Sequence, residues 1–209
     1  MRISRALSYR PPPPRDPDPV EGALAGTIGG AVLYTAGTVY PSTWAHEMGH
    51  ATATSLLYDA PFPDITVRPL SGGRTHIEWG MPLSSTGELL GEDLSWATTA
   101  AAAAVVDVGI AMTAFAVGHR LRPKHPVIGA SLMGFAGWSM LSRVAYAVSA
   151  LGGEGVKTLA AQGHDYAIMA THGGLHPLVA AGLMAAVLPA EYAVLRWLDH
   201  RAQSSSEQP

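Results

Sequence analysis

Apolar residues in this chain gather in four long stretches separated by short polar segments. The stretches cover residues 22–40, 94–117, 126–151 and 174–198. The first has no charged residue, and Asp107 and Arg143 are the only charged residues of the second and third. Since a helix needs about 20 residues to cross a bilayer, the pattern predicts four membrane-spanning helices.

The pattern changes between the first two stretches. Residues 41–58 form a separate predicted helix, with Ser42 as its N-cap after Pro41, and residues 59–63 end it.

Alternating strand-forming residues on either side of a Ser-Gly-Gly sequence at 71–73 predict a β-hairpin with strands in 64–70 and 74–80. Residues 82–93 are polar and acidic and are expected to form a surface loop. We therefore expect an all-α polytopic membrane protein, a bundle of about four to six helices with a small β-hairpin.

The chain divides into one domain with two polar ends. Residues 1–21 are basic and proline-rich and are predicted to be a disordered leader, because a run of four prolines excludes a helix. Residues 22–200 form the predicted single membrane-embedded domain, and 201–209 a disordered tail. The positive-inside rule places the leader, the basic linker 118–125 and the C-terminal end on the cytoplasmic side. With this orientation, helix 41–58 crosses only part of the membrane or returns to the side from which it entered. If it crosses the membrane fully instead, the basic linker 118–125 lies outside the cytoplasm.

Composition agrees with a membrane protein. Hydrophobic residues make up 48% of the chain and charged residues 14%, against roughly 25% charged in soluble domains. The alternative is a soluble all-α bundle with alanine-rich buried helices. A net charge of -3 gives no basic face for nucleic acid, and the absence of cysteine excludes thiolate metal sites and cysteine nucleophiles. Any metal ligands must be His, Asp or Glu.

The segment HEMGH at 46–50 indicates a specific chemistry. His46 and His50 are four residues apart, so both lie on one face of a helix and their imidazoles can bind the same zinc ion. Glu47 follows the first ligand and can reach a water held at the open position of such a zinc site. The sequence therefore predicts one zinc ion bound by His46 and His50, with Glu47 as the catalytic base.

A catalytic zinc site needs a third protein ligand. We favour Asp165, which follows a glycine-histidine pair at the start of a short apolar helix in GHDYAIMATHGG. The alternative is an ordinary aspartate at a helix N-terminus, where this residue is common. His164 is the neighbouring candidate, and His172 and His176 are weaker ones.

Asp107 and Arg143 are isolated charges within apolar helices. Charges at such positions are costly and are usually paired or functional. We expect a structural Asp107–Arg143 pair that joins two helices.

These residues resemble the site-2 protease family of intramembrane zinc metalloproteases, and in particular its small, divergent bacterial members. The resemblance rests on HEMGH at the head of an apolar helix, the following hairpin, the Ala/Gly-rich spans and a late aspartate. It covers 41–80 most clearly and 160–172 more loosely. By this resemblance His46, His50 and Asp165 are zinc ligands and Glu47 is the general base. The family's late motif has Asp followed by Gly after an Asn-Pro-rich run, whereas this chain reads GHDYA.

The expected function is membrane-embedded zinc metalloendopeptidase, with Glu47-assisted attack of zinc-bound water on peptide bonds. The expected partners are the lipid bilayer and a protein or peptide substrate, a transmembrane segment in particular, and no nucleic acid. The edge strand in 64–70 would pair with an unwound substrate.

The Ala/Gly/Arg bias and the lack of Cys suggest a bacterial inner membrane. The alternatives are a non-catalytic membrane protein with a structural or sensing metal site, and a scaffold or transporter with an incidental HExxH.

Overall fold

Helices form most of the computed structural model, which describes residues 19–69, 72–78 and 80–206. The predictions for residues 1–18 and 207–209 lie outside these residues. The elements in chain order are α1 (Pro19–Leu24), a π-helical turn η1 (Ala25–Gly29), α2 (Gly30–Val39), α3 (Pro41–Leu57), β1 (Ile65–Arg68), β2 (Gly72–Thr75), α4 (Ser85–Leu90), α5 (Glu92–Leu121), α6 (Pro126–Ser149), α7 (Val156–Ala161), α8 (Asp165–Gly173) and α9 (Pro177–Ser206).

Four helices in the described part of the chain are long and apolar enough to cross a membrane. They cover Pro19–Val39, Glu92–Leu121, Pro126–Ser149 and Pro177–Ser204, so each predicted apolar stretch forms one of them. Their ends differ from the prediction. Residues 19–21, assigned to the leader, begin α1, and residues 201–206, assigned to a disordered tail, continue α9.

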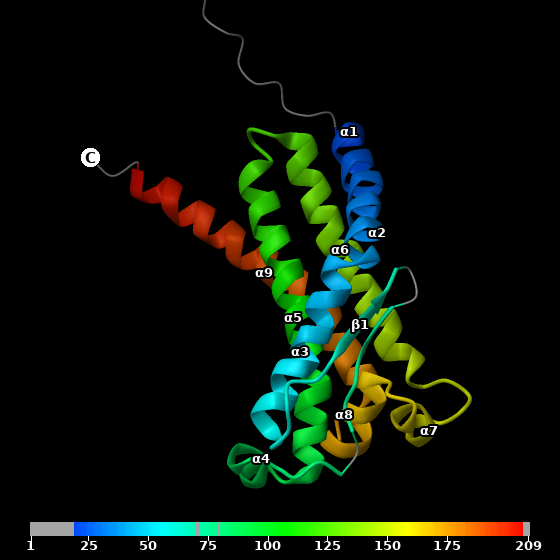
Figure 1. Ribbon diagram of the computed structural model, residues 1–209. Coiled ribbons are helices and arrows are strands. Elements are labelled where there is room, and N and C mark those ends of the chain that lie inside the picture. The colour runs from blue at the N-terminus through cyan, green and yellow to red at the C-terminus, as the bar shows by residue number, and fades with distance from the viewer. Residues whose placement is uncertain (1–18, 70–71, 79, 207–209) are drawn as a thin grey trace, which may run out of the picture.

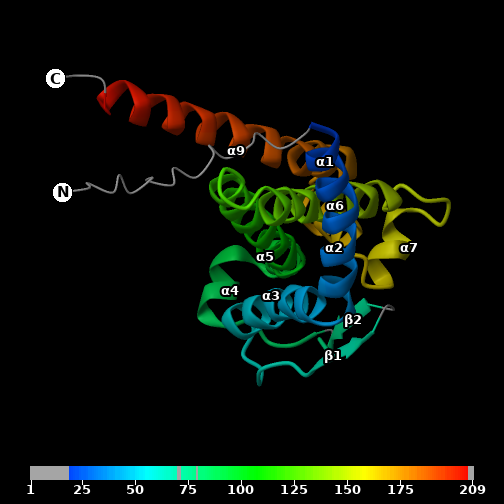
Figure 2. The same cartoon turned by 90° about the horizontal axis from the view of Figure 1, so that it is seen from above.

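The elements lie in successive layers across the molecule (Figure 2). α9 lies on one side, α5 and α6 pack against each other in the middle, α3 follows, and the hairpin covers the far face of α3. Along the long axis, α2 and α3 follow one another, with a break at Tyr40 (Figure 1). The start of α1 and the α5–α6 linker lie at one end, and α4, α7 and α8 lie at the other.

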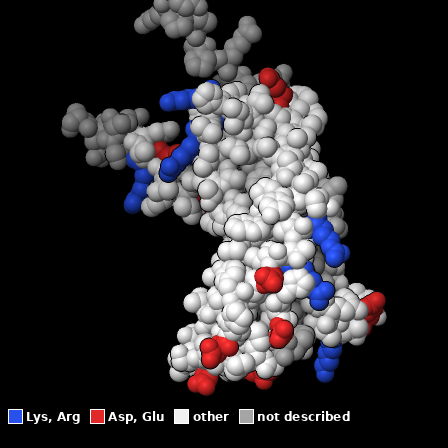
Figure 3. All heavy atoms as spheres, viewed as in Figure 1, with Lys and Arg blue, Asp and Glu red and all other residues white. Residues whose placement is uncertain are grey.

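Charge is unevenly distributed along this axis. Figure 3 shows mainly Lys and Arg at the end that carries the α5–α6 linker, mainly Asp and Glu at the end that carries α4, and a largely uncharged surface between them. Among the exposed large apolar residues are Val105 on α5 and Leu183 on α9. Such a band is what a helix bundle surrounded by lipid presents.

Small residues allow the central helices to approach closely. A Cβ added to Gly49 on α3 would lie 2.8 Å from the Ala103 Cα on α5. Gly30 and Gly134 form a similar backbone contact between α2 and α6. In lipid, where the hydrophobic effect does not drive helices together, this backbone contact supplies the packing.

Local structure between residues 40 and 93 differs from the prediction in three details. Pro41 is the first residue of α3, a position that suits proline because its missing N–H would have no partner there, so Ser42 lies within the first turn and is not the N-cap. The hairpin forms with Ile65 opposite Thr75, but Gly72 and Gly73 belong to β2. The acidic segment 82–93 is not all loop, since it contains α4, capped by Ser84, and the start of α5.

Candidate metal centre

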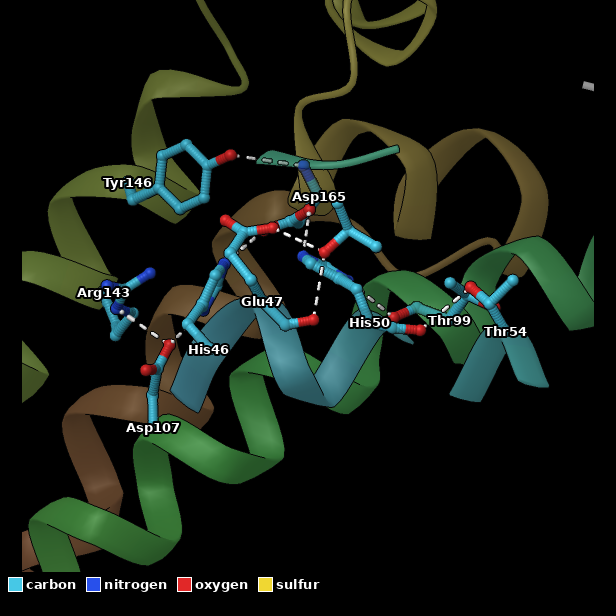
Figure 4. Close-up of polar contacts among 10 residues, drawn as sticks. His46, Glu47, His50, Thr54, Thr99, Asp107, Arg143, Tyr146 and Asp165 are labelled. Carbon is cyan, nitrogen blue, oxygen red and sulfur yellow. Dashed lines mark hydrogen bonds and ion pairs between the residues drawn. The ribbon is translucent and has the colours of Figure 1, made fainter. Parts of the chain in front are cut away.

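The HEMGH segment lies in the first half of α3 and faces α5 and α8. His50 and Glu47 are buried, and His46 is nearly so. The two imidazole rings are 5.0 Å apart between centroids and stand nearly perpendicular. Helical spacing therefore brings both rings to one face, as the sequence predicted (Figure 4).

Asp165, the first residue of α8, lies between the two rings. Its Oδ2 is 3.3 Å from His46 Nε2, and its Oδ1 is 3.2 Å from His50 Nε2. The candidate ligand atoms of these three residues all lie within 4.8 Å of one another. The structure thus brings together the three residues that the sequence selected.

The other ring nitrogen of each histidine has its own hydrogen-bond partner. His46 Nδ1 lies 2.7 Å from Asp107 Oδ2, and His50 Nδ1 lies 2.9 Å from the carbonyl oxygen of Thr99. Both partners are on α5. An acceptor at Nδ1 makes that nitrogen the donor, so Nε2, which faces Asp165, is the nitrogen left to bind a metal ion, as in many metal-binding histidines whose other ring nitrogen is held in this way.

The Asp107–Arg143 pair predicted from the sequence is present. Arg143 Nε lies 3.1 Å from Asp107 Oδ2, the same oxygen that contacts His46. The contact of Asp107 with His46 was not predicted from the sequence. The signal for it was an isolated carboxylate in an apolar helix, but no spacing rule relates position 107 to position 46.

His164, the neighbouring candidate, points elsewhere. Its Nε2 lies 3.0 Å from Ser149 Oγ, and its ring stacks on Tyr146 at 4.2 Å between centroids. His172 contacts Asp93, and His176 accepts a hydrogen bond from the backbone N–H of Leu178. These three histidines do not belong to the cluster of His46, His50 and Asp165.

Glu47 is held by the hairpin. The Thr75 hydroxyl on β2 lies 2.7 Å from Glu47 Oε2 and 3.0 Å from the Glu47 carbonyl oxygen. Gly73 passes so close that an added Cβ would lie 2.5 Å from Glu47 Cγ. Only a glycine allows the strand to lie this near, so β2 fixes the carboxylate beside the cluster.

A pocket of about 670 Å³ opens over the cluster. Its wall includes His46, Glu47, His50 and Asp165, together with all four residues of β2 and, on α6, Ser142, Arg143 and Tyr146. Within the described residues, β1 contributes nothing to this wall. The volume lies in the range of small-ligand sites, roughly 300–1,000 Å³.

The electrostatics of the pocket favour positive charge at the histidines. Burial alone would lower the pKa of His46, but its hydrogen bonds to Asp107 and Asp165 prevail and raise that pKa to about 9. The pKa of His50 is also raised, because Asp165 outweighs the effect of burial. Burial would raise the pKa of Asp165, yet its hydrogen bonds to the two histidines hold this pKa well below its usual value. The same carboxylates would attract a bound cation.

The donor set fits a divalent metal ion. Two ligand atoms at about 2.0–2.1 Å from a tetrahedral ion are separated by roughly 3.4 Å. His46 Nε2 lies 3.3 Å from Asp165 Oδ2 and His50 Nε2 lies 3.2 Å from Asp165 Oδ1, so each imidazole is close to that separation from one of the two carboxylate oxygens. His46, His50 and Asp165 could therefore hold a metal ion.

Comparisons with protein-family models, curated proteins and solved structures found no match for this chain.

Proposed function

We propose that the protein is a membrane-embedded zinc metalloendopeptidase, similar to the site-2 protease family, that cleaves membrane or membrane-proximal proteins. One observation carries the proposal: His46, His50 and Asp165 converge within 4.8 Å beside the Glu47 carboxylate at the wall of a pocket. A metal-binding set with an adjacent carboxylate and space for a substrate is the minimum that peptide hydrolysis requires.

Zinc is the metal that best suits these ligands. Two imidazoles and one carboxylate form a common set for catalytic zinc, and a three-ligand set keeps a position open. When bound, zinc lowers the pKa of a water ligand towards 7 and polarises a carbonyl group. The contacts of His46 with Asp107 and of His50 with the Thr99 carbonyl would hold both rings ready for the ion.

Glu47 is the proposed general base. Its carboxylate takes a proton from the attacking water and delivers it to the leaving amine when the C–N bond breaks. Thr75 donates to Oε2, which leaves Oε1 to accept that proton. The pocket admits water to a site among apolar helices, which hydrocarbon alone would exclude.

The proposed substrate is an extended segment, in particular an unwound transmembrane segment. The sequence hypothesis assigned its pairing to the strand in 64–70, but β2 is the strand that lines the pocket. We therefore assign substrate pairing to β2, by addition of a strand to its edge. The proposed location is a bacterial inner membrane.

Zinc content and cleavage test the proposal together. Purified protein should contain one equivalent of zinc and cleave casein or a membrane peptide, and His46→Ala should lose both properties. Glu47→Gln should keep its zinc and lose cleavage, whereas Glu88→Gln, on the exposed surface of α4, should keep both. Zinc without cleavage in the wild type would favour the structural or sensing site, and no zinc would favour an incidental HExxH.

A further inference from the structure

Two hydrogen-bond donors on α6, the side chains of Arg143 and Tyr146, line the pocket together with the hairpin strand β2. Arg143 and Tyr146 lie three residues apart, hence on the same face of the helix, and both line the pocket wall with the cluster of His46, His50 and Asp165. Figure 4 shows them side by side, next to Glu47 and His46. The proposed roles of zinc and Glu47 in hydrolysis involve neither residue.

Arg143 has donors to spare. A guanidinium carries five N–H groups in a fixed plane, and the contact with Asp107 uses the one at Nε. Its side chain keeps 22% of its surface exposed, towards the pocket. Replacing a buried ion pair by apolar residues is often neutral for stability, so fold stability alone gives little reason for a charged pair at this position.

Tyr146 is held in place with its hydroxyl hydrogen available. The ring stacks on His164, and the hydroxyl oxygen accepts a hydrogen bond from the backbone N–H of Asp165 at 3.4 Å. Within the described residues, no acceptor is assigned to the hydroxyl hydrogen itself. The hydroxyl lies next to Asp165, the first residue of α8, at the edge of the cluster.

We infer that Arg143 and Tyr146 bind the oxygen that becomes negatively charged during hydrolysis. This inference rests on the proposed peptidase function. As the water oxygen bonds to the carbonyl carbon, the π electron pair moves onto the carbonyl oxygen and Glu47 takes the water proton. When the C–N bond breaks, the pair returns to re-form C=O and the proton passes to the amine. Fixed donors aimed at that oxygen lower the barrier because they need no reorganisation.

Charge compensation distinguishes this role from capture of a substrate carboxylate. Asp107 offsets part of the charge on Arg143 across 3.1 Å, through the same oxygen that contacts His46. A guanidinium whose charge is partly offset, next to a neutral phenol, suits an oxygen that becomes charged only in the transition state. It suits the fully charged carboxylate of a substrate C-terminus less well. The pocket should therefore favour internal peptide bonds.

The test compares Tyr146→Phe and Arg143→Lys with Tyr166→Phe as the matched control. Tyr166 is buried beside Tyr146 but does not line the pocket. The probe is N-phosphoryl-leucinamide, whose tetrahedral phosphoryl oxygens mimic the charged intermediate, titrated calorimetrically into zinc-loaded protein. Both pocket variants should bind the probe at least about 10-fold more weakly. Their kcat on casein should fall at similar KM, with zinc content unchanged, and Tyr166→Phe should match the wild type.

Each other outcome has a definite meaning. Wild-type affinity and kcat in both pocket variants would overturn the inference, as would a loss of zinc, which indicates a purely structural role. A wild type that fails to bind the probe would overturn it as well. If zinc-loaded wild type binds the probe but cleaves nothing, the peptidase proposal fails alone, and weaker binding by the two variants still supports an oxyanion site.

Discussion

The two halves of the HEMGH site differ in what orients each histidine. On the His46 side, the partner is the Asp107 side chain, which also contacts Arg143, so three side chains on three helices form one network. On the His50 side, the partner is the backbone carbonyl of Thr99. One ring is oriented by groups that a substitution can remove, and the other by the main chain of α5.

This difference predicts unequal sensitivity to mutation. The His46 side should respond to substitutions on α5 and α6, because both helices contribute to its network. Among substitutions on α5 and α6, the His50 side should respond only to those that move α5 relative to α3. Asp165 joins the two sides, since each of its oxygens faces one ring.

Removing Asp165 should have the largest effect. Asp165→Ala deletes a group shared by both sides, so we expect zinc affinity to fall by more than about 100-fold. Removal of a residue that only hydrogen-bonds to a metal ligand typically lowers metal affinity by roughly 10- to 100-fold. Competition with a chelator measures this affinity. His164→Ala is the control, because that ring faces Ser149 and Tyr146. Loss of zinc in His164→Ala, with binding retained in Asp165→Ala, would identify His164 as the ligand.

Replacing Asp107 should disable the His46 side alone. Asp107→Ala leaves the His46 Nδ1–H without its acceptor, so zinc affinity should decrease by about 10- to 100-fold. Asp107→Asn keeps an oxygen that can accept this hydrogen bond and should lose less. Equal affinities in Asp107→Ala and the wild type would show that His46 needs no partner on α5.

Gly49→Ala tests the contact between α3 and α5. The added methyl would meet the Ala103 backbone at 2.8 Å, and overpacking of this kind costs about 1–3 kcal/mol. Gly109→Ala on α5 is the matched control, since no atom of the described residues lies within 4 Å of its added Cβ. Helix propensity should make this variant neutral or stabilised by up to about 1 kcal/mol. The free energy of unfolding in detergent measures both variants. Equal stabilities would disprove the tight contact.

Thr99→Ala should have the smallest effect. The substitution keeps the carbonyl that orients His50 and removes a buried hydroxyl that has no hydrogen-bond partner among the described residues. Zinc affinity should stay within about twofold of the wild type, in contrast to Asp107→Ala. A decrease of roughly 10-fold or more is expected only when the hydrogen-bond partner of a zinc ligand is itself removed. A large loss in Thr99→Ala would remove the distinction between the two sides.

The sequence was informative wherever function depends on local spacing. The apolar stretches predicted four candidate spans, and the four-residue spacing predicted that His46 and His50 share a face. The Gly-His-Asp sequence placed Asp165 at the start of a helix, where the structure has it. That these residues bind zinc and catalyse hydrolysis stays a prediction.

Tertiary contacts were beyond the reach of the sequence. The meeting of Asp107 with His46 and of Thr75 with Glu47 joins positions 61 and 28 residues apart. Both depend on how helices and hairpin pack, and no local periodicity encodes that packing. The helical continuation through 201–206 was missed for a different reason, because its polar composition resembles that of a disordered tail.

A single oxygen atom, Asp107 Oδ2, serves both His46 and Arg143. This sharing limits how the protein can be redesigned. A substitution at 107 that tunes the histidine also releases the arginine, and a substitution at 143 changes the charge that the histidine meets. Engineers who wish to alter the metal preference of this site will therefore have to exchange both positions together, as a unit.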